Sequence, residues 1–203
     1  ATTREARGMK PENIVILTGA GISAESGIDT FRDAKDGGGG LWENHSIYDV
    51  ATPEGFARDP DMVLRFYDER RAKLASVEPN PAHIALGRLE REFDGNLLLV
   101  TQNVDDLHER GGSTRALHMH GELKSALCTS CGTRSPWDST MIERPPCPVC
   151  QAPTLRPDVV WFGEMPYQMG RIEAALEACD LFVSIGTSGA VYPAAGFVDG
   201  AKR

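Results

Sequence analysis

The chain has 203 residues, of which 41% are hydrophobic and 25% charged, enough apolar material for one globular domain and a small additional module. The 29 acidic residues outnumber the 21 basic ones, which gives a formal net charge of -8. Because nucleic-acid binding depends on cationic contacts to phosphates, we expect no direct nucleic-acid binding. No apolar run approaches the roughly 20 residues that cross a bilayer, so we expect no membrane insertion.

Residues 1–12 carry charges but lack the apolar segment that a secretory signal needs, and they are predicted to form an N-terminal tail. Four of the five cysteines stand in two C-x-x-C pairs, a usage that suits a reducing compartment and a bound metal better than disulfides. We therefore expect a cytoplasmic protein.

Short apolar runs separated by helical patterns predict the fold class. The runs that read as buried strands are residues 14–18, 96–101 and 181–185. The segments with helical apolar spacing are residues 62–70, 84–89 and 172–179. Buried strands that alternate with helices predict an α/β fold with a mainly parallel sheet. Residues 124–155 lack a helical period and are rich in Cys, Pro, Ser and Thr, so they are predicted to form an inserted module.

A glycine-rich turn follows the first predicted strand. Gly19-Ala20-Gly21-Ile22-Ser23-Ala24 is a G-x-G-x-x-A pattern that opens towards a helix. Glycines let the backbone approach a pyrophosphate, whose charge the amide N–H groups of a helix N-terminus can meet. The alternative is a plain tight turn. No second strand ending in an acidic residue follows about 20 residues later, which argues against an ordinary NAD(P) dehydrogenase half.

Gly186-Thr187-Ser188-Gly189 is a second candidate phosphate loop, directly after the third predicted strand. Taken alone, this segment reads equally well as a simple loop. Two such loops in one parallel sheet form the crevice in which ligands bind in this fold class. Gln102, Asn103 and Asp105 follow the second predicted strand, at the position where α/β proteins build their sites, and are expected to be functional.

The cysteine pairs Cys128-x2-Cys131 and Cys147-x2-Cys150 have the spacing of a zinc ribbon. Each pair presents two thiolates to one tetrahedral Zn²⁺, and four protein ligands leave no open position for water. We therefore predict one structural zinc; two disulfides or a redox pair are the alternatives. Cys179 falls on the apolar face of a predicted helix and is expected to be a core residue.

Histidines are the candidates for acid–base chemistry at neutral pH. His118 and His120 are two residues apart, so both point to one face if that segment is extended, and the spacing leaves open which of them is the base. His45 and His83 have no motif around them and are expected to have surface or packing roles.

Several motifs occur together in an order that resembles sirtuins, the NAD-dependent protein-lysine deacylases, and most closely their bacterial CobB type. They are Gly19-Ala20-Gly21-Ile22-Ser23, Gly27-Ile28 with Phe31-Arg32, Thr101-Gln102-Asn103-Val104-Asp105, His120-Gly121, the two C-x-x-C pairs, Phe162-Gly163-Glu164 and Gly186-Thr187-Ser188. The resemblance covers residues 13–203. It implies a Rossmann-like NAD-binding domain made of 13–123 and 156–203, with the small zinc module 124–155 inserted.

The resemblance also implies residue roles, with NAD as co-substrate and acylated lysine side chains of proteins as partners. His120, the histidine before glycine, matches the catalytic base, which leaves His118 a structural role. The residues that match the NAD site are Gly19, Ala20, Gly21, Ser23, Phe31, Arg32, Gln102, Asn103, Val104, Asp105, Gly186, Thr187 and Ser188. Val160, Phe162 and Gly163 match a strand that pairs with the substrate peptide.

Tyr67 and Arg70 are neighbours on one helical face, a pattern that otherwise describes an amphipathic surface helix. Sirtuins that remove succinyl and malonyl groups resemble this chain here, with a Tyr-x-x-Arg pair that binds the distal carboxylate of the acyl group. The planar guanidinium of Arg suits this task because it can bind a carboxylate through two hydrogen bonds. The resemblance thus implies a deacetylase and desuccinylase that releases lysine, nicotinamide and O-acyl-ADP-ribose.

Sirtuins continue beyond the point that corresponds to Arg203, so the resemblance implies that the C-terminal part is truncated. Two other functions stay open: a protein mono-ADP-ribosyltransferase, and a non-catalytic fragment that binds acyl-peptides. Gly37 to Gly40 extend a loop that is usually shorter in the family, and nothing beyond added flexibility explains them.

Overall fold

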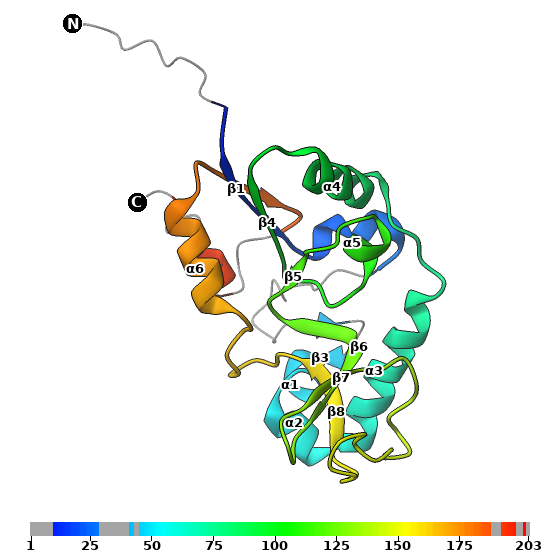
Figure 1. Ribbon diagram of the computed structural model, residues 1–203. Coiled ribbons are helices and arrows are strands. Elements are labelled where there is room, and N and C mark those ends of the chain that lie inside the picture. Colours follow the sequence, from blue (N-terminus) through cyan, green and yellow to red (C-terminus); the bar gives the residue numbers. More distant parts are fainter. Residues whose placement is uncertain (1–9, 29–40, 43–44, 188–191, 198–200, 202–203) are drawn as a thin grey trace, which may run out of the picture.

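A computed structural model describes residues 10–28, 41–42, 45–187, 192–197 and 201. The fold has two parts, a parallel sheet with helices on both faces and a smaller antiparallel sheet packed beside three helices (Figure 1). None of the helices in these ranges is long and apolar enough to span a membrane.

The larger sheet has the strand order β5-β4-β1-β9, and every pairing in it is parallel. The strands are β1 (Asn13–Thr18), β4 (Asn96–Thr101), β5 (Leu117–His118) and β9 (Leu181–Ile185). This sheet confirms the predicted α/β fold class. Thr18 lies opposite both Thr101 and Ile185, so β1, β4 and β9 end at the same level and their following loops meet at one edge.

Side chains of β1 alternate between two cores. Val15 and Leu17 pack with Ile172 and Leu176 of α6 (Met169–Ala178). Ile14 and Ile16 face the other side and pack with Leu86 of α4 (Pro81–Glu92). An apolar residue at every strand position is what a sheet covered on both faces requires. The short helix α5 (Leu107–Arg110) and the 3-10 helices η1 (Ala20–Ile22), η2 (Ala24–Ser26) and η3 (Ala194–Gly196) complete this part.

The smaller sheet has the antiparallel order β7-β6-β8. Its strands are β6 (Gly121–Cys128), β7 (Arg134–Pro136) and β8 (Leu155–Val159). The sheet therefore includes residues on both sides of the range 124–155, because β8 supplies the antiparallel partner of β6.

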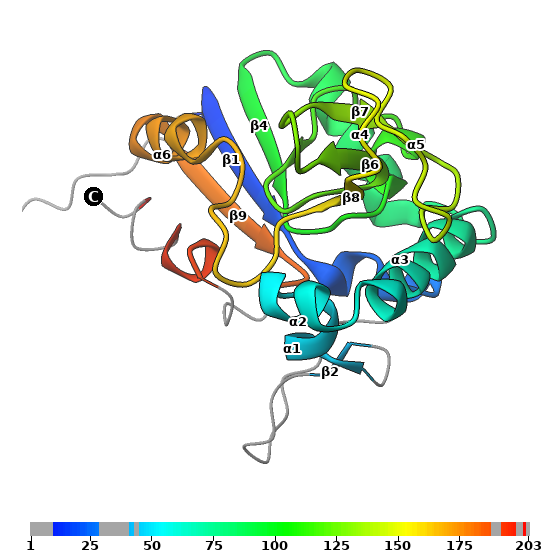
Figure 2. The same ribbon diagram turned by 90° about the horizontal axis from the view of Figure 1, so that it is seen from below.

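Three helices pack beside this sheet: α1 (Ile47–Val50), α2 (Pro53–Arg58) and α3 (Pro60–Leu74). A two-stranded ribbon, β2 (Leu41–Trp42) with β3 (His45–Ser46), precedes them. Phe66 and Tyr67 of α3 share a core with Leu123, Val159 and Trp161, which ties the helix to β6 and β8. Figure 2 shows α1 and α2 beyond the ends of β1 and β9, so the two parts of the protein face each other at the carboxyl edge of the parallel sheet.

Candidate active site

A cavity of about 520 Å³ lies at this edge of the parallel sheet. Its walls come from the turn after β1, the segment after β4, the loop after β9, and the segment that follows β8. The sequence-predicted residues in its lining are Gly19, Ala20, Gly21, Ser23, Gln102, Asn103, Val104, Asp105, His120, Val160, Phe162, Gly163, Gly186 and Thr187. The fold thus gathers one cluster from segments that are far apart in the sequence.

The two glycine loops touch through their backbones. Gly21 N donates to Gly186 O at 2.7 Å, and Gly19 N donates to Ile185 O at 3.0 Å. Gly186 has a φ of 63°, which favours glycine. The turn after β1 continues as η1 and η2, so the expected α-helix does not begin there. Ala20 N, at the start of η1, has no acceptor in the part of the chain that the structure describes, and it is the amide of this turn that an anionic ligand can use.

Gly21→Ala is expected to lower both stability and affinity for a ligand in the cavity. The added Cβ would lie 2.8 Å from Gly186 Cα and 2.8 Å from Gly186 O, so the two loops must separate. We expect a thermal unfolding midpoint lower by several degrees and at least tenfold weaker ligand binding by calorimetry, the usual scale for an overpacked site. Gly170→Ala is the control, since its Cβ meets nothing within 4 Å and it lies in α6. Equal behaviour of the two variants would contradict the prediction.

A buried polar network forms part of the cavity wall. Ser23 Oγ donates to Asp105 Oδ2 at 2.9 Å and accepts from Asn103 Nδ2 at 2.9 Å. Asp105 Oδ1 accepts from Leu107 N at 3.1 Å, and burial raises the pKa of Asp105 above its ordinary value. The network fixes the orientation of the Asn103 amide and the Asp105 carboxyl, which are 7% and 5% exposed.

His83 belongs to this network, although no motif in the sequence marks it. Its Nδ1 accepts from Asn80 N at 3.3 Å in the capping box of α4, so Nε2 carries the proton and faces Ser23 Oγ at 3.4 Å. His108 is also fully buried, its Nε2 lies 2.9 Å from Thr18 Oγ1, and its ring centroid lies 5.0 Å from that of His83. Burial lowers the pKa of His108 to about 4, and burial also lowers that of His83, so both rings are neutral at pH 7. The only sequence signal for His83 was its position three residues after the helix-capping Asn80.

His118 and His120 hold neighbouring carbonyl groups of the segment after β4. His120 Nδ1 lies 3.2 Å from Gln102 O, and His118 Nδ1 lies 2.9 Å from Asn103 O. A carbonyl can only accept, so Nδ1 of His120 carries the proton and the lone pair is on Nε2. Burial lowers the pKa of His120, which keeps this ring neutral.

His118 differs from His120 in its second nitrogen, which lies 3.0 Å from Glu109 Oε1. Burial alone lowers the pKa of His118, but the hydrogen bond and charge of Glu109 outweigh it and raise the pKa. His120 lines the cavity while His118 is committed to a carbonyl and a carboxylate. The structure therefore separates two histidines that their spacing could not.

The four cysteines of the predicted metal site converge. All four Sγ atoms lie within 4.8 Å of one another, with 3.6 Å between Cys128 and Cys150 and 3.8 Å between Cys131 and Cys147. Tetrahedral Zn–S bonds of about 2.3 Å place sulfur atoms about 3.8 Å apart, so this donor set fits a zinc ion. All four are free cysteines, which does not support the alternative of two disulfides.

Comparisons with known proteins identify the family. A model of the Sir2 family matches residues 19–193. The chain belongs to the Sir2 family. A Vibrio cholerae protein named NAD-dependent protein deacylase is 61% identical over 193 residues, covering 94% of this chain and 77% of the relative. A Pasteurella multocida protein of the same name is 58% identical over 193 residues, covering 93% of this chain and 80% of the relative.

Solved structures agree with this family. A Sir2 homologue in complex with NAD has a TM-score of 0.83 at 43% identity, covering 95% of this chain and 75% of that chain. A Sir2 protein bound to a propionylated peptide has a TM-score of 0.77 at 29% identity, covering 96% of this chain and 78% of that chain. The resemblance to sirtuins and the fold expected from it are confirmed.

The prediction of a strand at Phe162-Gly163-Glu164 in this Sir2 chain is wrong. β8 ends at Val159, and the backbone then turns, with Glu164 N donating to Trp161 O at 2.9 Å. Phe162 N is bonded to Ala51 O at 2.9 Å, and Val160 N to His120 O at 2.8 Å. The N–H groups of Val160 and Phe162 are thus bonded to other segments of the chain. Gly163, with a φ of 91°, then interrupts the extended conformation that a strand needs.

Tyr67 and Arg70 of the Sir2 chain lie behind the cavity wall. Trp161 Nε1 donates to Tyr67 Oη at 2.9 Å, and Arg70 Nη1 donates to Phe66 O at 2.7 Å. Of these described residues Trp161 lines the cavity, and Tyr67 and Arg70 do not. Tyr67 is fully buried and Arg70 is 6% exposed, so both lie on the buried face of α3. The predicted residues Phe31, Arg32 and Ser188 lie outside the described residues, as do Gly37 to Gly40.

Proposed function

We propose that this Sir2 protein is an NAD-dependent protein deacylase that removes acyl groups, including acetyl and succinyl, from lysine side chains. One observation carries the proposal: a half-buried, neutral His120, with its proton held on Nδ1 by Gln102 O, lines a cavity bounded by two glycine loops. The names of its relatives support the same reaction.

The cavity fits a dinucleotide in its chemistry. Gly19 and Gly21 let the loops after β1 and β9 approach each other closely, and Ala20 N offers a donor for a pyrophosphate oxygen. Gln102 Nε2 donates to Thr187 Oγ1 at 3.0 Å, which joins the segment after β4 to the loop after β9. NAD, when bound, supplies the ribose carbon to which the acyl oxygen is transferred and the nicotinamide that departs. Asn103, Val104 and Asp105 would lie against its nicotinamide and ribose, and Gly186 with Thr187 against the adenosine side.

His120 is the general base in this proposal. A neutral imidazole with its lone pair on Nε2 can remove a proton from a ribose hydroxyl, and the carbonyl of Gln102 stabilises the imidazolium that forms. Asp105 and Ser23 hold the Asn103 amide so that it can orient the leaving nicotinamide. The products would be free lysine, nicotinamide and O-acyl-ADP-ribose.

The acyl-lysine peptide would enter along the segment Val160–Gly163, by main-chain hydrogen bonds. Because the N–H groups of Val160 and Phe162 are already used within the chain, carbonyl oxygens of this segment must carry much of that pairing.

We further propose one structural zinc at Cys128, Cys131, Cys147 and Cys150, which the sulfur distances support. Four thiols available as ligands suit a reducing compartment, and we place the protein in the cytoplasm.

Arg70→Met is expected to reduce desuccinylation far more than deacetylation. An Arg70 guanidinium that turns from Phe66 O to a succinyl carboxylate would make charge-assisted hydrogen bonds, whose loss lowers kcat/KM about 10- to 100-fold. An acetyl group has no carboxylate, so its kcat/KM should change less than about threefold. Arg65→Met is the matched control, because Arg65 lies on the exposed side of the same helix. Equal losses for both peptides would remove the assignment of Arg70.

Product analysis tests the function as a whole. Acetyl-lysine and succinyl-lysine peptides are incubated with the protein, with and without NAD, and the products are identified by mass spectrometry. NAD-dependent loss of the acyl group with formation of O-acyl-ADP-ribose supports the deacylase. ADP-ribose attached to the peptide would instead indicate a mono-ADP-ribosyltransferase, and binding without turnover by folded protein a non-catalytic module.

A further inference from the structure

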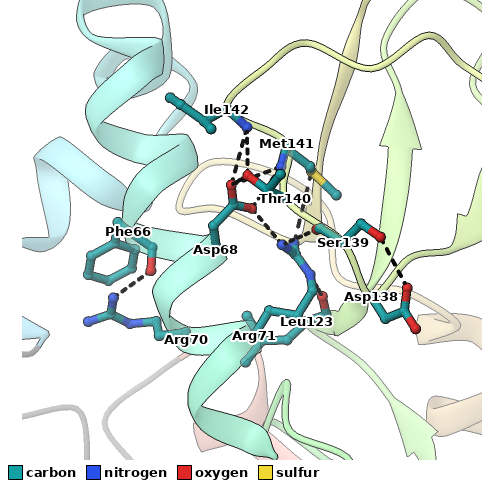
Figure 3. Close-up of polar contacts among 10 residues, drawn as sticks. All are labelled: Phe66, Asp68, Arg70, Arg71, Leu123, Asp138, Ser139, Thr140, Met141 and Ile142. Atoms are coloured by element: carbon teal, nitrogen blue, oxygen red, sulfur yellow. Dashed lines mark hydrogen bonds and ion pairs between the residues drawn. The ribbon is translucent and has the colours of Figure 1, made fainter.

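Helix α3 presents a second polar pair beside the Tyr67–Arg70 face. Asp68 and Arg71 form an ion pair of 2.6 Å, and their side chains are 14% and 3% exposed. Figure 3 shows both side chains directed towards the segment 138–142, whereas Arg70 points away from it to Phe66. Burial of an ion pair costs desolvation free energy, which further hydrogen bonds to both charged groups can offset. The other hydrogen-bond partners of Asp68 and Arg71 therefore indicate the role of the pair.

Asp68 receives a set of donors from one short segment. Met141 N donates to Asp68 Oδ2 at 2.8 Å, Ile142 N donates to it at 3.2 Å, and Thr140 Oγ1 donates to it as well. A carboxylate that accepts two consecutive backbone N–H groups fixes both the position and the direction of that backbone. Asp68 therefore anchors the segment 140–142 to α3.

Arg71 completes the anchor from the other side. Its Nε donates to Leu123 O in β6 at 2.7 Å, and its Nη1 donates to Ser139 O at 3.1 Å. Three donors of one planar guanidinium group thus reach Asp68, the sheet strand and the loop (Figure 3). The pair joins the middle of α3 to both β6 and the segment before the second cysteine pair.

The anchored segment is continuous with the four-cysteine cluster. Met141 is fully buried and shares a core with Cys128 and Cys147, so its position depends on how those cysteines are held. Tyr67 and Arg70, one residue before each member of the pair, face the other way, and Tyr67 accepts from Trp161 in the cavity wall. A small rotation or shift of α3 is therefore transmitted from one site to the other.

We propose that Asp68 and Arg71 are positioning residues that couple the four-cysteine module to the acyl-recognition face of α3. The proposal rests on the function proposed above for Tyr67 and Arg70. When the cysteines lose their metal-binding geometry, Met141 moves and the donors to Asp68 move with it. Helix α3 then loses the position from which Arg70, which bonds Phe66 O in this structure, can turn towards the acyl chain. A displacement of about 1 Å at a binding group is enough to cost up to about 100-fold in rate. Acyl selectivity then depends on residues that never touch the acyl group.

Asp68→Asn tests this coupling in the zinc-loaded protein by two measurements. The amide keeps the size of Asp68 but turns one acceptor into a donor facing Met141 N and Ile142 N. We expect kcat/KM for a succinyl peptide to fall about tenfold more than that for an acetyl peptide, mainly through KM. We also expect zinc release to a chromogenic chelator to become about tenfold faster. A role confined to stability would lower the folded fraction and leave both KM values and their ratio unchanged.

Asp61→Asn is the matched control, because Asp61 also pairs from α3 to Arg144, but at 56% exposure of its side chain. Thr140→Ala removes a single exposed donor to Asp68 and provides a milder variant if Asp68→Asn does not fold. An unchanged acyl ratio in a variant of the pair, while Arg70→Met does shift it, overturns the coupling. If Arg70→Met itself leaves the succinyl-to-acetyl ratio of kcat/KM unchanged, the assignment of Arg70 to acyl recognition fails. Zinc release then still tests whether Asp68 and Arg71 hold the four-cysteine module. Zinc release from Asp68→Asn at the same rate as from Asp61→Asn would overturn that role.

Discussion

His120→Ala is expected to lower kcat/KM for deacylation by about 10²- to 10⁴-fold while the protein stays folded. The side chain is part of the cavity wall and its Nδ1 makes one hydrogen bond to Gln102 O, so alanine removes the base without opening a core. Steady-state kinetics with an acetyl-lysine peptide, together with circular dichroism, measure both effects. His45→Ala is the control, because His45 is exposed and lies in a T-shaped contact with Phe66, away from the residues that line the cavity.

The pH dependence of kcat/KM adds a second signature to the same prediction. Burial lowers the pKa of His120 below its ordinary value of 6.5, while the hydrogen bond to Gln102 only partly offsets this effect. The base must be neutral to accept a proton, so the fall of kcat/KM on the acid side should have its midpoint below pH 6.5. The His120→Ala variant should lack this acid limb. An acid limb centred above pH 6.5 in the wild type, or activity within tenfold of it in the variant, would contradict the role of His120.

Cys147→Ser is expected to release the metal and unfold the smaller part of the protein. Cys147 is 1% exposed, its Sγ lies 3.8 Å from that of Cys131, and it belongs to the core that contains Leu64 and Met141. Since binding energy at a structural zinc is folding energy, loss of one ligand should lower the free energy of unfolding by several kcal/mol. Zinc content by elemental analysis and unfolding in urea measure the two effects. Removal of zinc by a chelator from the wild type should reproduce them.

Cys179→Ser separates metal binding from the loss of any thiol. Cys179 lies at the end of α6, where its Sγ donates to Leu176 O at 3.2 Å, far from the four-cysteine cluster in the fold. A serine hydroxyl can make the same hydrogen bond, so we expect normal zinc content and a change of less than about 1 kcal/mol. Retention of one zinc per chain by Cys147→Ser, with unchanged unfolding, would show that Cys147 is not a ligand.

Local pattern was sufficient for much of the fold. The runs 14–18, 96–101 and 181–185 became β1, β4 and β9 of one parallel sheet whose faces are covered by helices. The expected burial holds for residues 14–18 of β1, whereas β9 lies at the edge of the described sheet and its residues are half-buried or exposed. The glycine loops met because neighbouring parallel strands end at one edge. The cysteine spacing predicted a cluster that the structure contains, because each C-x-x-C pair is a local turn that needs little from the rest of the chain.

Contacts between distant segments decided the rest. The sequence by itself determined the α/β class, the sheet edge at which the cavity lies, the four-cysteine cluster and, by its motifs, the Sir2 family. The motifs already matched His120 rather than His118 to the base, and the tertiary structure supplied the contacts that distinguish the two rings. Only the tertiary structure brought His83 to Ser23, turned the segment after β8, and placed Tyr67 behind Trp161. Each of these depends on a hydrogen-bond partner that lies many residues away. Burial and pairing of a polar group are set by which segments pack together, and no local period in the sequence records that.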